Sequence, residues 1–416
     1  MYSAPLMSRS TRPPAQRRAA QRGEAAAPEA PRTDGPASWR QLLADVFAPF
    51  ALSRLLLGFV AWLFADQPRG LTWIPQFSQR GWAYSPVRWI DMWARWDSEW
   101  YLGIVKNGYQ VGGYAIGEYS SLAFFPIYPQ AVRLLYRLLP TAWQGNQAAL
   151  VLGLIVANLC AVGAVTMLYW HVRVRFNDRA MAERSVLFLL VFPTAFFLGC
   201  FYTESAFLLI AVAAYHMAWR RRWAAAGILG GLLSATRPVG VLMVLPFLWI
   251  QLEDAEFRIK QLVRRAGWLA LVPAGFVAYA IYLWRVTGDV GAVLLAQRGW
   301  HKEFASPLAL FGAPPTPYGD IVQVDRALTL AFAAAAVWLL SRRAWRADGL
   351  VVCVMLAAFV FTGTPISASR YLLVAFPVFV WLAQRRSEAV RQAYVAVGVA
   401  VQTALWVCWV LMRWVA

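Results

Sequence analysis

The stretch QAALVLGLIVANLCAVGAVTMLYW, residues 147–170, contains no charged side chain, and the basic stretch HVRVRFNDRAMAER, residues 171–184, follows it directly. An apolar helix of this length can cross the hydrocarbon core of a bilayer, which is about 30 Å thick. Further apolar runs closed by arginines recur along the 416-residue chain, which is 60% hydrophobic and 14% charged. This composition excludes an ordinary water-soluble globular protein. It predicts an all-α polytopic membrane protein.

The positive charge of the chain accompanies its apolar segments. The formal net charge is +18, and all but three of the 39 basic residues are arginines. Because these arginines close apolar runs, as in the cytoplasmic loops of membrane proteins, we expect no nucleic-acid partner. The preference for arginine, together with the abundance of alanine, is typical of a GC-rich genome and favours a bacterial source.

The apolar runs predict about eleven transmembrane helices when the N-terminus is placed in the cytoplasm. This placement puts the strongly basic connections on the cytoplasmic side, as the positive-inside rule requires. The doubtful segment is 223–251, which we interpret as a hairpin whose tip at Arg237 reaches the external leaflet, because one kinked helix would invert the charge pattern after it. The predicted spans are about 41–65, 147–170, 185–201, 203–219, 223–236, 239–251, 266–284, 326–341, 349–365, 369–384 and 391–414.

Residues 1–38 precede this transmembrane domain of residues 39–416. They are rich in Ala, Pro and Arg and lack hydrophobic periodicity. Such a segment cannot bury enough apolar surface to offset the entropy cost of ordering. We expect a disordered basic cytoplasmic tail.

Two long external loops are predicted, at about 66–146 and about 285–325. The first contains the apolar stretch 123–139, which could pass for a span. Arg133 and Arg137 lie one helical turn apart in it, and both would enter lipid if it crossed the membrane. We therefore expect an amphipathic helix at the membrane interface.

The cysteines and histidines are scattered, mostly inside apolar runs, and no CxxC spacing occurs. This pattern predicts neither a disulfide framework nor a histidine metal site, and no cofactor is expected, although the sequence leaves divalent metal open. The residues are Cys160, Cys200, Cys353, Cys408, His171, His216 and His301.

The stretch WIDMWARWDSEWYLGIVKNGY, residues 89–109, is the densest aromatic and acidic segment. If its first part is helical, its tryptophans form one face, Asp91 pairs with Arg95 one turn later, and Glu99 points away from Asp97. Asp97 has no partner at helical spacing and lies beside aromatic side chains. It is therefore the candidate general base, with a surface carboxylate or a helix cap as the alternatives. The tryptophans are Trp89, Trp93, Trp96 and Trp100.

Four further polar residues lie at the predicted external ends of spans. Tyr202 and Glu204 lie between two spans, where an ionisable group is a functional candidate, although Glu204 could instead cap the next helix. Arg237 and Arg370 lie on the same external side and favour an anionic ligand such as a phosphate, with interaction with lipid headgroups as the alternative.

Five segments, in order, resemble the signature of the PIG-V mannosyltransferases, which belong to the GT-C superfamily of integral-membrane glycosyltransferases. The first two contain the RWD and FFP motifs typical of that family. An insertion between them, VGGYAIGEYSSL at 111–122, departs from the pattern where acceptor choice would be set. The five segments are RWDSEWYLGIVKNGY (95–109), AFFPIYP (123–129), PTAFFLGCFYTESAFLL (193–209), ATRPVG (235–240) and SRYLLVAFP (369–377).

The resemblance implies a GT-C-type bundle whose long first external loop bears the catalytic aspartate, and a lipid-linked sugar donor. Eukaryotic members add the second mannose to the glycosylphosphatidylinositol precursor in the ER lumen. The family's RWD aspartate matches Asp97. The matching motif and structural positions are Arg95, Trp96, Glu99, Gly108, Tyr109, Phe125, Pro126, Tyr128 and Pro129.

We therefore expect an inverting glycosyltransferase that moves mannose, or another hexose, from a polyprenyl phosphate to a hydroxyl of a glycolipid or glycoprotein outside the cytoplasmic membrane. Asp97 is the expected base. The expected donor-binding residues are Arg237, Arg370, Lys302, Glu204 and Tyr202. A transporter or flippase of lipid-linked sugars and a non-catalytic scaffold are the alternatives, and neither would turn over the donor.

Overall fold

The computed structural model describes residues 38–64, 84–116, 118–256, 267–300, 304–312, 319–362 and 367–415. The predicted tail lies outside these residues except for Ser38, and so do parts of both predicted external loops. Every regular element within the described ranges is a helix. The prediction of an all-α protein is therefore confirmed.

Five helices are long and apolar enough to cross a membrane, and each coincides with a predicted span. The first, Trp39–Leu63, joins α2 (Trp39–Leu42), the π-helical turn η1 (Leu43–Phe47) and α3 (Ala48–Leu63). These helices make the chain an integral membrane protein. The other four are α8 (Asn146–Phe176), Gly267–Thr287 with η7 (Gly267–Leu271) and α14 (Ala274–Thr287), Ile321–Ser341 within α16 (Gly319–Ser341), and α20 (Glu388–Val410).

Shorter helices occupy the other predicted spans, so the count of eleven spans stays a prediction. Several are broken by 3-10 turns, such as η5 (Ala195–Gly199) and η6 (Pro238–Met243). Irregular backbone at membrane depth is tolerated only where protein buries it, and η5 is fully buried. The short helices are α9 (Arg179–Leu190), α10 (Glu204–Trp219), α11 (Trp223–Ser234), α12 (Val244–Asp254), α17 (Arg346–Val360), α18 (Ala368–Leu372) and α19 (Pro377–Ala383); η9 (Arg343–Trp345) precedes α17.

The described part of the first predicted external loop consists of short helices. Its α7 has buried Val132 and Tyr136 on one face and exposed Leu134 and Leu138 on the other, so a short amphipathic helix replaces a span here. Arg133 donates from Nη1 to the carbonyl oxygens of Ile104 and Val105, at 2.9 and 2.8 Å, and so satisfies the end of α6. The elements are α5 (Arg88–Asp91), α6 (Ser98–Asn107), η2 (Tyr114–Ile116), η3 (Ser121–Ala123), α7 (Ile127–Arg137) and η4 (Thr141–Trp143).

The expected helical face of tryptophans across residues 89–100 is wrong. The chain leaves the helix after Asp91 and re-enters it at Ser98, with Trp96 in the left-handed region at φ 51°. Tertiary hydrogen bonds replace helical ones in this break: the Trp93 carbonyl accepts from the Phe201 amide at 3.0 Å. Consequently Trp89 is 60% exposed, whereas Trp96 is 6% exposed.

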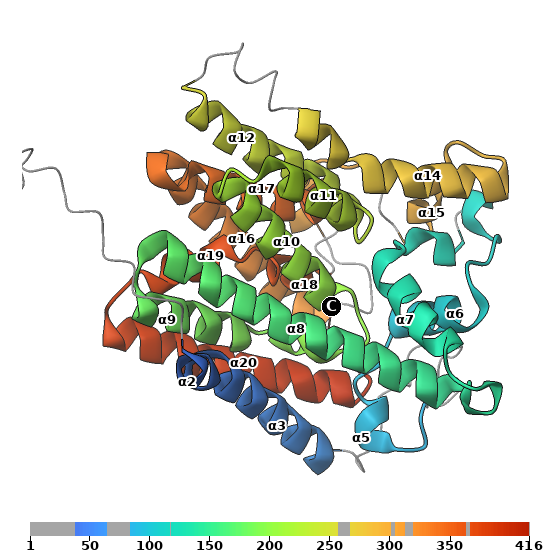
Figure 1. Ribbon diagram of the computed structural model, residues 1–416. Coiled ribbons are helices and arrows are strands. Elements are labelled where there is room, and N and C mark those ends of the chain that lie inside the picture. Colours follow the sequence, from blue (N-terminus) through green and yellow to red (C-terminus); the bar gives the residue numbers. More distant parts are fainter. Residues whose placement is uncertain are drawn as a thin grey trace, which may run out of the picture. The chain divides into compact units, whose positions relative to one another are not determined.

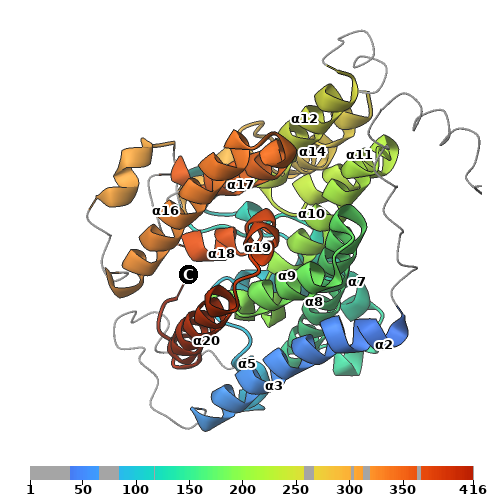
Figure 2. The same cartoon turned by 90° about the vertical axis from the view of Figure 1, so that its left-hand side faces the viewer.

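The helices pack side by side in an order that differs from their order along the chain (Figures 1 and 2). The first and last helices, α3 and α20, are neighbours in both views, and Trp406 of α20 donates from Nε1 to the Leu57 carbonyl at 2.8 Å. Likewise, α16 runs along α17. The short helix α18 and the C-terminal end lie close together between these layers.

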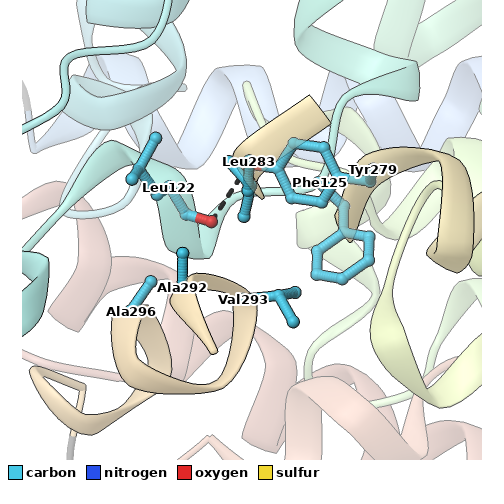
Figure 3. Packing of buried hydrophobic residues seen from close by; sticks show 7 residues of the cluster. All are labelled: Leu122, Phe125, Tyr279, Leu283, Ala292, Val293 and Ala296. Atoms are coloured by element: carbon cyan, nitrogen blue, oxygen red, sulfur yellow. Dashed lines mark hydrogen bonds between the residues drawn. The ribbon is translucent and has the colours of Figure 1, made fainter. Parts of the chain in front are cut away.

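The two predicted external loops pack against each other. Figure 3 shows the apolar cluster that joins the segment before α7 to α14 and α15 (Ala292–Arg298). The Tyr279 hydroxyl closes it by donating to the carbonyl oxygens of Leu122 and Phe124, at 3.0 and 3.1 Å. A further turn, η8 (Pro307–Phe311), follows α15. The cluster is Leu122, Phe125, Tyr279, Leu283, Ala292, Val293 and Ala296.

Candidate active site

Four charged side chains from distant parts of the sequence meet in one network, here called the site cluster: Asp97, Glu204, Arg237 and Arg370. Asp97 precedes α6, Glu204 begins α10, Arg237 precedes η6, and Arg370 lies in α18. Arg370 pairs with Asp97 through Nη1 and Oδ2 at 2.8 Å. Its Nε lies 3.2 Å from Glu204 Oε1. A single arginine therefore connects the two carboxylates.

Arg237 is the second arginine that contacts Glu204. Its Nη2 donates to the same Oε1 atom that faces Arg370, and its Nε donates to Thr203 Oγ1 at 2.9 Å. Glu204 is fully buried. The buried carboxylate thus holds two guanidinium groups next to each other, which offsets part of their mutual repulsion.

Three buried atoms of the site cluster form no hydrogen bond with the residues that the structure describes. Two are donors, Arg237 Nη1 and Arg370 Nε, and one is an acceptor, Glu204 Oε2. Most buried polar atoms in proteins are paired, so an unpaired donor and an unpaired acceptor in one network require an explanation. A bound ligand with both an anionic oxygen and a hydroxyl would satisfy them.

Aromatic rings surround the two arginines. The guanidinium carbon of Arg370 lies 5.2 Å from the ring centroid of Tyr202, and that of Arg237 lies 5.3 Å from the ring of Tyr371. Phe207 contributes a third ring, 5.8 Å from Arg237. These cation–π contacts stabilise the charges and exclude water, which strengthens electrostatic interactions within the site cluster.

Tyr202 fixes the backbone at Asp97. Its hydroxyl donates to the Arg95 carbonyl at 2.9 Å and accepts from the Asp97 amide at 3.1 Å. Arg95 in turn pairs with Asp91 at 3.1 Å, which confirms the predicted pair, although both side chains are buried. The motif therefore places Asp97 by hydrogen bonds to the loop before α10.

Tyr101 lies beside the same network, where its hydroxyl donates to Thr203 Oγ1 at 3.5 Å. Burial, reinforced by the charges of Asp97 and Glu204, raises the pKa of the Tyr101 hydroxyl far above its ordinary value. The hydroxyl is therefore a neutral donor at physiological pH. Among these neighbours, the carboxylates are the groups able to accept a proton.

Of the residues selected from the sequence, the structure brings together Asp97, Tyr202, Glu204, Arg237 and Arg370. Asp97 was expected to lack a partner at helical spacing, and the partner that the structure gives it, Arg370, lies in α18. Lys302 lies outside the described residues.

The remaining motif residues build the scaffold beside the site cluster. Tyr109 donates to the Phe124 carbonyl at 2.8 Å, and Tyr128 donates to the Gly153 carbonyl at 2.9 Å. Pro126 caps α7 and Pro129 is buried within it. Glu99 lies in the first turn of α6, and Phe125 belongs to the apolar cluster of Figure 3.

Sequence reasoning missed Asp325, which holds the residue before Arg370. Its Oδ1 accepts from the Ser369 amide at 2.8 Å, and the carboxylate is 2% exposed. Asp325 lies within a candidate membrane span. An ionisable residue in such a span is a functional candidate by default, and this signal could have identified it.

Comparison with known families relates this geometry to an enzyme class. The family model described as Mannosyltransferase (PIG-V) matches residues 85–269. The matched segment is less than half of the chain, and over this segment the sequence is similar to the PIG-V mannosyltransferases. The match includes Asp97, Glu204 and Arg237, whereas Arg370 lies beyond it. The resemblance inferred from the motifs is thereby confirmed.

The fold is also similar to that of ArnT from Cupriavidus metallidurans, solved bound to undecaprenyl phosphate, with a TM-score of 0.51 at 12% identity. The alignment covers 85% of this chain and 63% of ArnT, so the chain spans less than two thirds of that protein. The Archaeoglobus fulgidus oligosaccharyltransferase, in its apo form, aligns with a TM-score of 0.44, 13% identity and coverage of 91% and 57%. No curated protein matches the sequence. The similarity to ArnT supports the expected fold, a GT-C-type bundle of helices.

Proposed function

We propose that this protein is an inverting glycosyltransferase that moves mannose, or a related hexose, from a polyprenyl phosphate to an acceptor hydroxyl. The observation that carries the proposal is the site cluster, in which Asp97 of the RWD motif pairs with buried Arg370, and Glu204 holds Arg370 next to a second buried arginine, Arg237. Carboxylates can accept protons, and paired guanidinium groups match the geometry of phosphate oxygens.

Arg237 and Arg370 are the proposed binding residues for the donor phosphate. Arg237 Nη1 is buried without a partner among the described residues and is available to an anionic oxygen. The ArnT structure of similar fold holds undecaprenyl phosphate, which supports a lipid phosphate as the donor group. Because Glu204 keeps both guanidinium groups adjacent, one phosphate can contact both. Glu204 Oε2 would then accept a hydrogen bond from a hydroxyl of the donor sugar.

Asp97 is the proposed general base. It removes the proton from the acceptor hydroxyl while that oxygen forms a bond to C1 of the sugar, on the face opposite the phosphate. The bond from C1 to the phosphate oxygen breaks, and the electron pair remains on the phosphate. Arg237 and Arg370 stabilise the charge that develops on it, which is where preorganised donors lower the barrier most. Arg370 contacts Asp97 and so couples the two ends of the reaction.

We further propose that the site cluster faces the outside of a bacterial cytoplasmic membrane. The basic connections between predicted spans support this orientation, since they place the N-terminus and the arginine-rich loops in the cytoplasm. An external site would also lack nucleotide sugars, which fits a lipid-linked donor.

Turnover of the donor tests the proposal directly. Membranes that contain the protein should consume polyprenyl-phosphate [3H]mannose and produce a labelled glycolipid or glycoprotein, whereas matched membranes without it should not. A flippase would move the donor across the bilayer without cleaving it. If the donor stays intact at the level of the control membranes, the proposed function is wrong.

A further inference from the structure

Four aromatic side chains form a second cluster beside the site cluster, here called the aromatic platform: Trp100, Tyr119, Phe124 and Trp300. The Trp300 ring lies 4.8 Å from Tyr119, 5.2 Å from Phe124 and 5.7 Å from Trp100, measured between centroids. Trp100 and Phe124 stack at 6.0 Å. The platform joins α6, the insertion 111–122 and the end of α15 with the segment before α7.

The aromatic platform begins one helical turn from the proposed base. Trp100 lies three residues after Asp97, and residues at this spacing are neighbours on a helix surface. Tyr101 connects the two clusters from the other side, because its ring lies 5.0 Å from Phe124 and 6.0 Å from Tyr202. A molecule resting on Trp100 would therefore reach Asp97.

The aromatic platform has one solvent-exposed ring and one buried hydrogen-bond donor without a partner among the described residues. Tyr119 is 51% exposed, Trp100 and Trp300 are half-buried, and Phe124 is buried. The Nε1 atom of Trp300 is itself buried and has no hydrogen-bond partner among the described residues. Buried indole N–H groups usually find a partner, and this donor is available to an acceptor on a bound molecule.

The backbone beneath the aromatic platform is tightly held. A Cβ atom on Gly299 would come within 2.2 Å of the Glu118 carbonyl oxygen, so only glycine allows these two segments to approach. Gln297 adds a hydrogen bond from Nε2 to the Ala123 carbonyl at 3.0 Å. The rings are thus preorganised, and binding to them costs little ordering entropy.

A sugar ring fits these properties. Its C–H face carries partial positive charge and packs on the negative face of an aromatic ring, while its hydroxyls can accept from an indole N–H. An alkyl chain would leave the Trp300 donor unpaired. In the proposed reaction the donor phosphate binds to Arg237 and Arg370. The aromatic platform lies further along α6 from Asp97, so it is the candidate binding site for the acceptor, whose hydroxyl must reach Asp97.

We propose that the aromatic platform binds the sugar ring of the acceptor, so that the acceptor is a glycan or glycolipid whose hydroxyl is presented to Asp97. The assignment of the bound sugar as the acceptor rests on the proposed function, but binding of a sugar to the aromatic platform can be measured without turnover. It also assigns a role to Tyr119 in the insertion that departs from the family pattern.

Saturation-transfer NMR on the purified protein in lipid nanodiscs tests the aromatic platform, with methyl α-D-mannopyranoside as the probe. The ring protons of the probe should receive saturation from the wild type. Tyr119→Ala removes an exposed ring and Trp300→Phe removes the N–H, and each should weaken binding by about five-fold, the scale of one aromatic contact or hydrogen bond. Trp143→Ala is the matched control, because Trp143 is an exposed tryptophan of the same loop region outside the platform.

Three outcomes would overturn the inference. Both platform variants could bind the probe as tightly as the wild type. Cyclohexanol could bind equally well and lose affinity in the same variants, which would make the aromatic platform a general apolar surface. Unlabelled polyprenyl-phosphate mannose could displace the probe, which would assign the rings to the donor sugar. A failure of glycosyl transfer with intact, platform-dependent sugar binding would instead overturn only the proposed function.

Discussion

The site cluster and the Arg175–Asp348 pair are both buried ion-pair systems, but they differ in how completely their atoms are satisfied. Arg175 donates from Nη1 and Nη2 to Oδ1 and Oδ2 of Asp348, each at 2.7 Å, and from Nη2 to the Ala344 carbonyl at 3.1 Å. In the site cluster, two arginines lie against one oxygen of Glu204, and two donors and one acceptor form no hydrogen bond with the described residues.

This difference is the one we expect between a structural pair and the proposed binding site. The Arg175–Asp348 pair connects α8 to α17 with one arginine for one carboxylate, and both carboxylate oxygens accept from that arginine. The site cluster has a network that is complete only with a further partner. Unpaired buried atoms cost free energy, and proteins retain them where a ligand recovers it.

The largest expected effect comes from Asp97→Asn. Asparagine is nearly isosteric but cannot accept the proton, so turnover should fall by about 10² to 10⁴-fold, the usual contribution of general-base catalysis. The measurement is transfer of labelled mannose per folded protein.

Glu99→Gln is the matched control, because it neutralises a carboxylate two residues further along the chain, in the first turn of α6, and should have a modest effect. An active Asp97→Asn enzyme together with an inactive Glu99→Gln enzyme would show that the base has been misassigned.

A smaller effect, and one of a different kind, is expected from Asp348→Asn. The substitution leaves Arg175, whose side chain is 10% exposed, without its counter-charge, which costs about 3 to 5 kcal/mol of stability. The melting temperature in detergent should fall clearly, while turnover per folded molecule stays unchanged. Loss of turnover without loss of stability would contradict the distinction between the structural pair and the site cluster.

The smallest effect is expected from Tyr202→Phe. The variant keeps the ring against Arg370 but loses the hydroxyl that connects the Arg95 carbonyl to the Asp97 amide. One hydrogen bond contributes about 1 kcal/mol, so turnover should fall about five-fold. A loss as large as that of Asp97→Asn would mean that the Tyr202 hydroxyl itself takes part in the reaction.

Most of the fold was predictable because its signals are local. Apolar length and the position of arginines identify helices such as Asn146–Phe176 and Glu388–Val410 within a few residues. The break before Ser98 was not predictable, because hydrogen bonds to residues more than 100 positions away, such as Phe201 to Trp93, replace the helical ones. Periodicity alone continues a helix through this segment.

The site was predictable as a set of residues but not as a network. Motifs identified Asp97, Glu204, Arg237 and Arg370 separately, while the pair between Asp97 and Arg370 spans 273 positions and has no sequence signal. Burial also changes the expected contribution of an ion pair to the free energy of unfolding. The Asp91–Arg95 pair is worth at most about 0.5 kcal/mol on an exposed helix, but both partners are buried here, so breaking it costs several times more.

The central claim is that the incompletely paired site cluster holds the donor phosphate, and equilibrium binding of a [32P]-labelled short-chain polyprenyl phosphate to Arg237→Lys protein tests it most directly. Lysine keeps the positive charge but cannot donate from two nitrogens to Glu204 and to a phosphate at once. We expect the dissociation constant to rise at least about ten-fold, with an unchanged melting temperature, since charge-assisted hydrogen bonds contribute about 1.5 to 3 kcal/mol. Wild-type affinity in the Arg237→Lys protein would contradict the account.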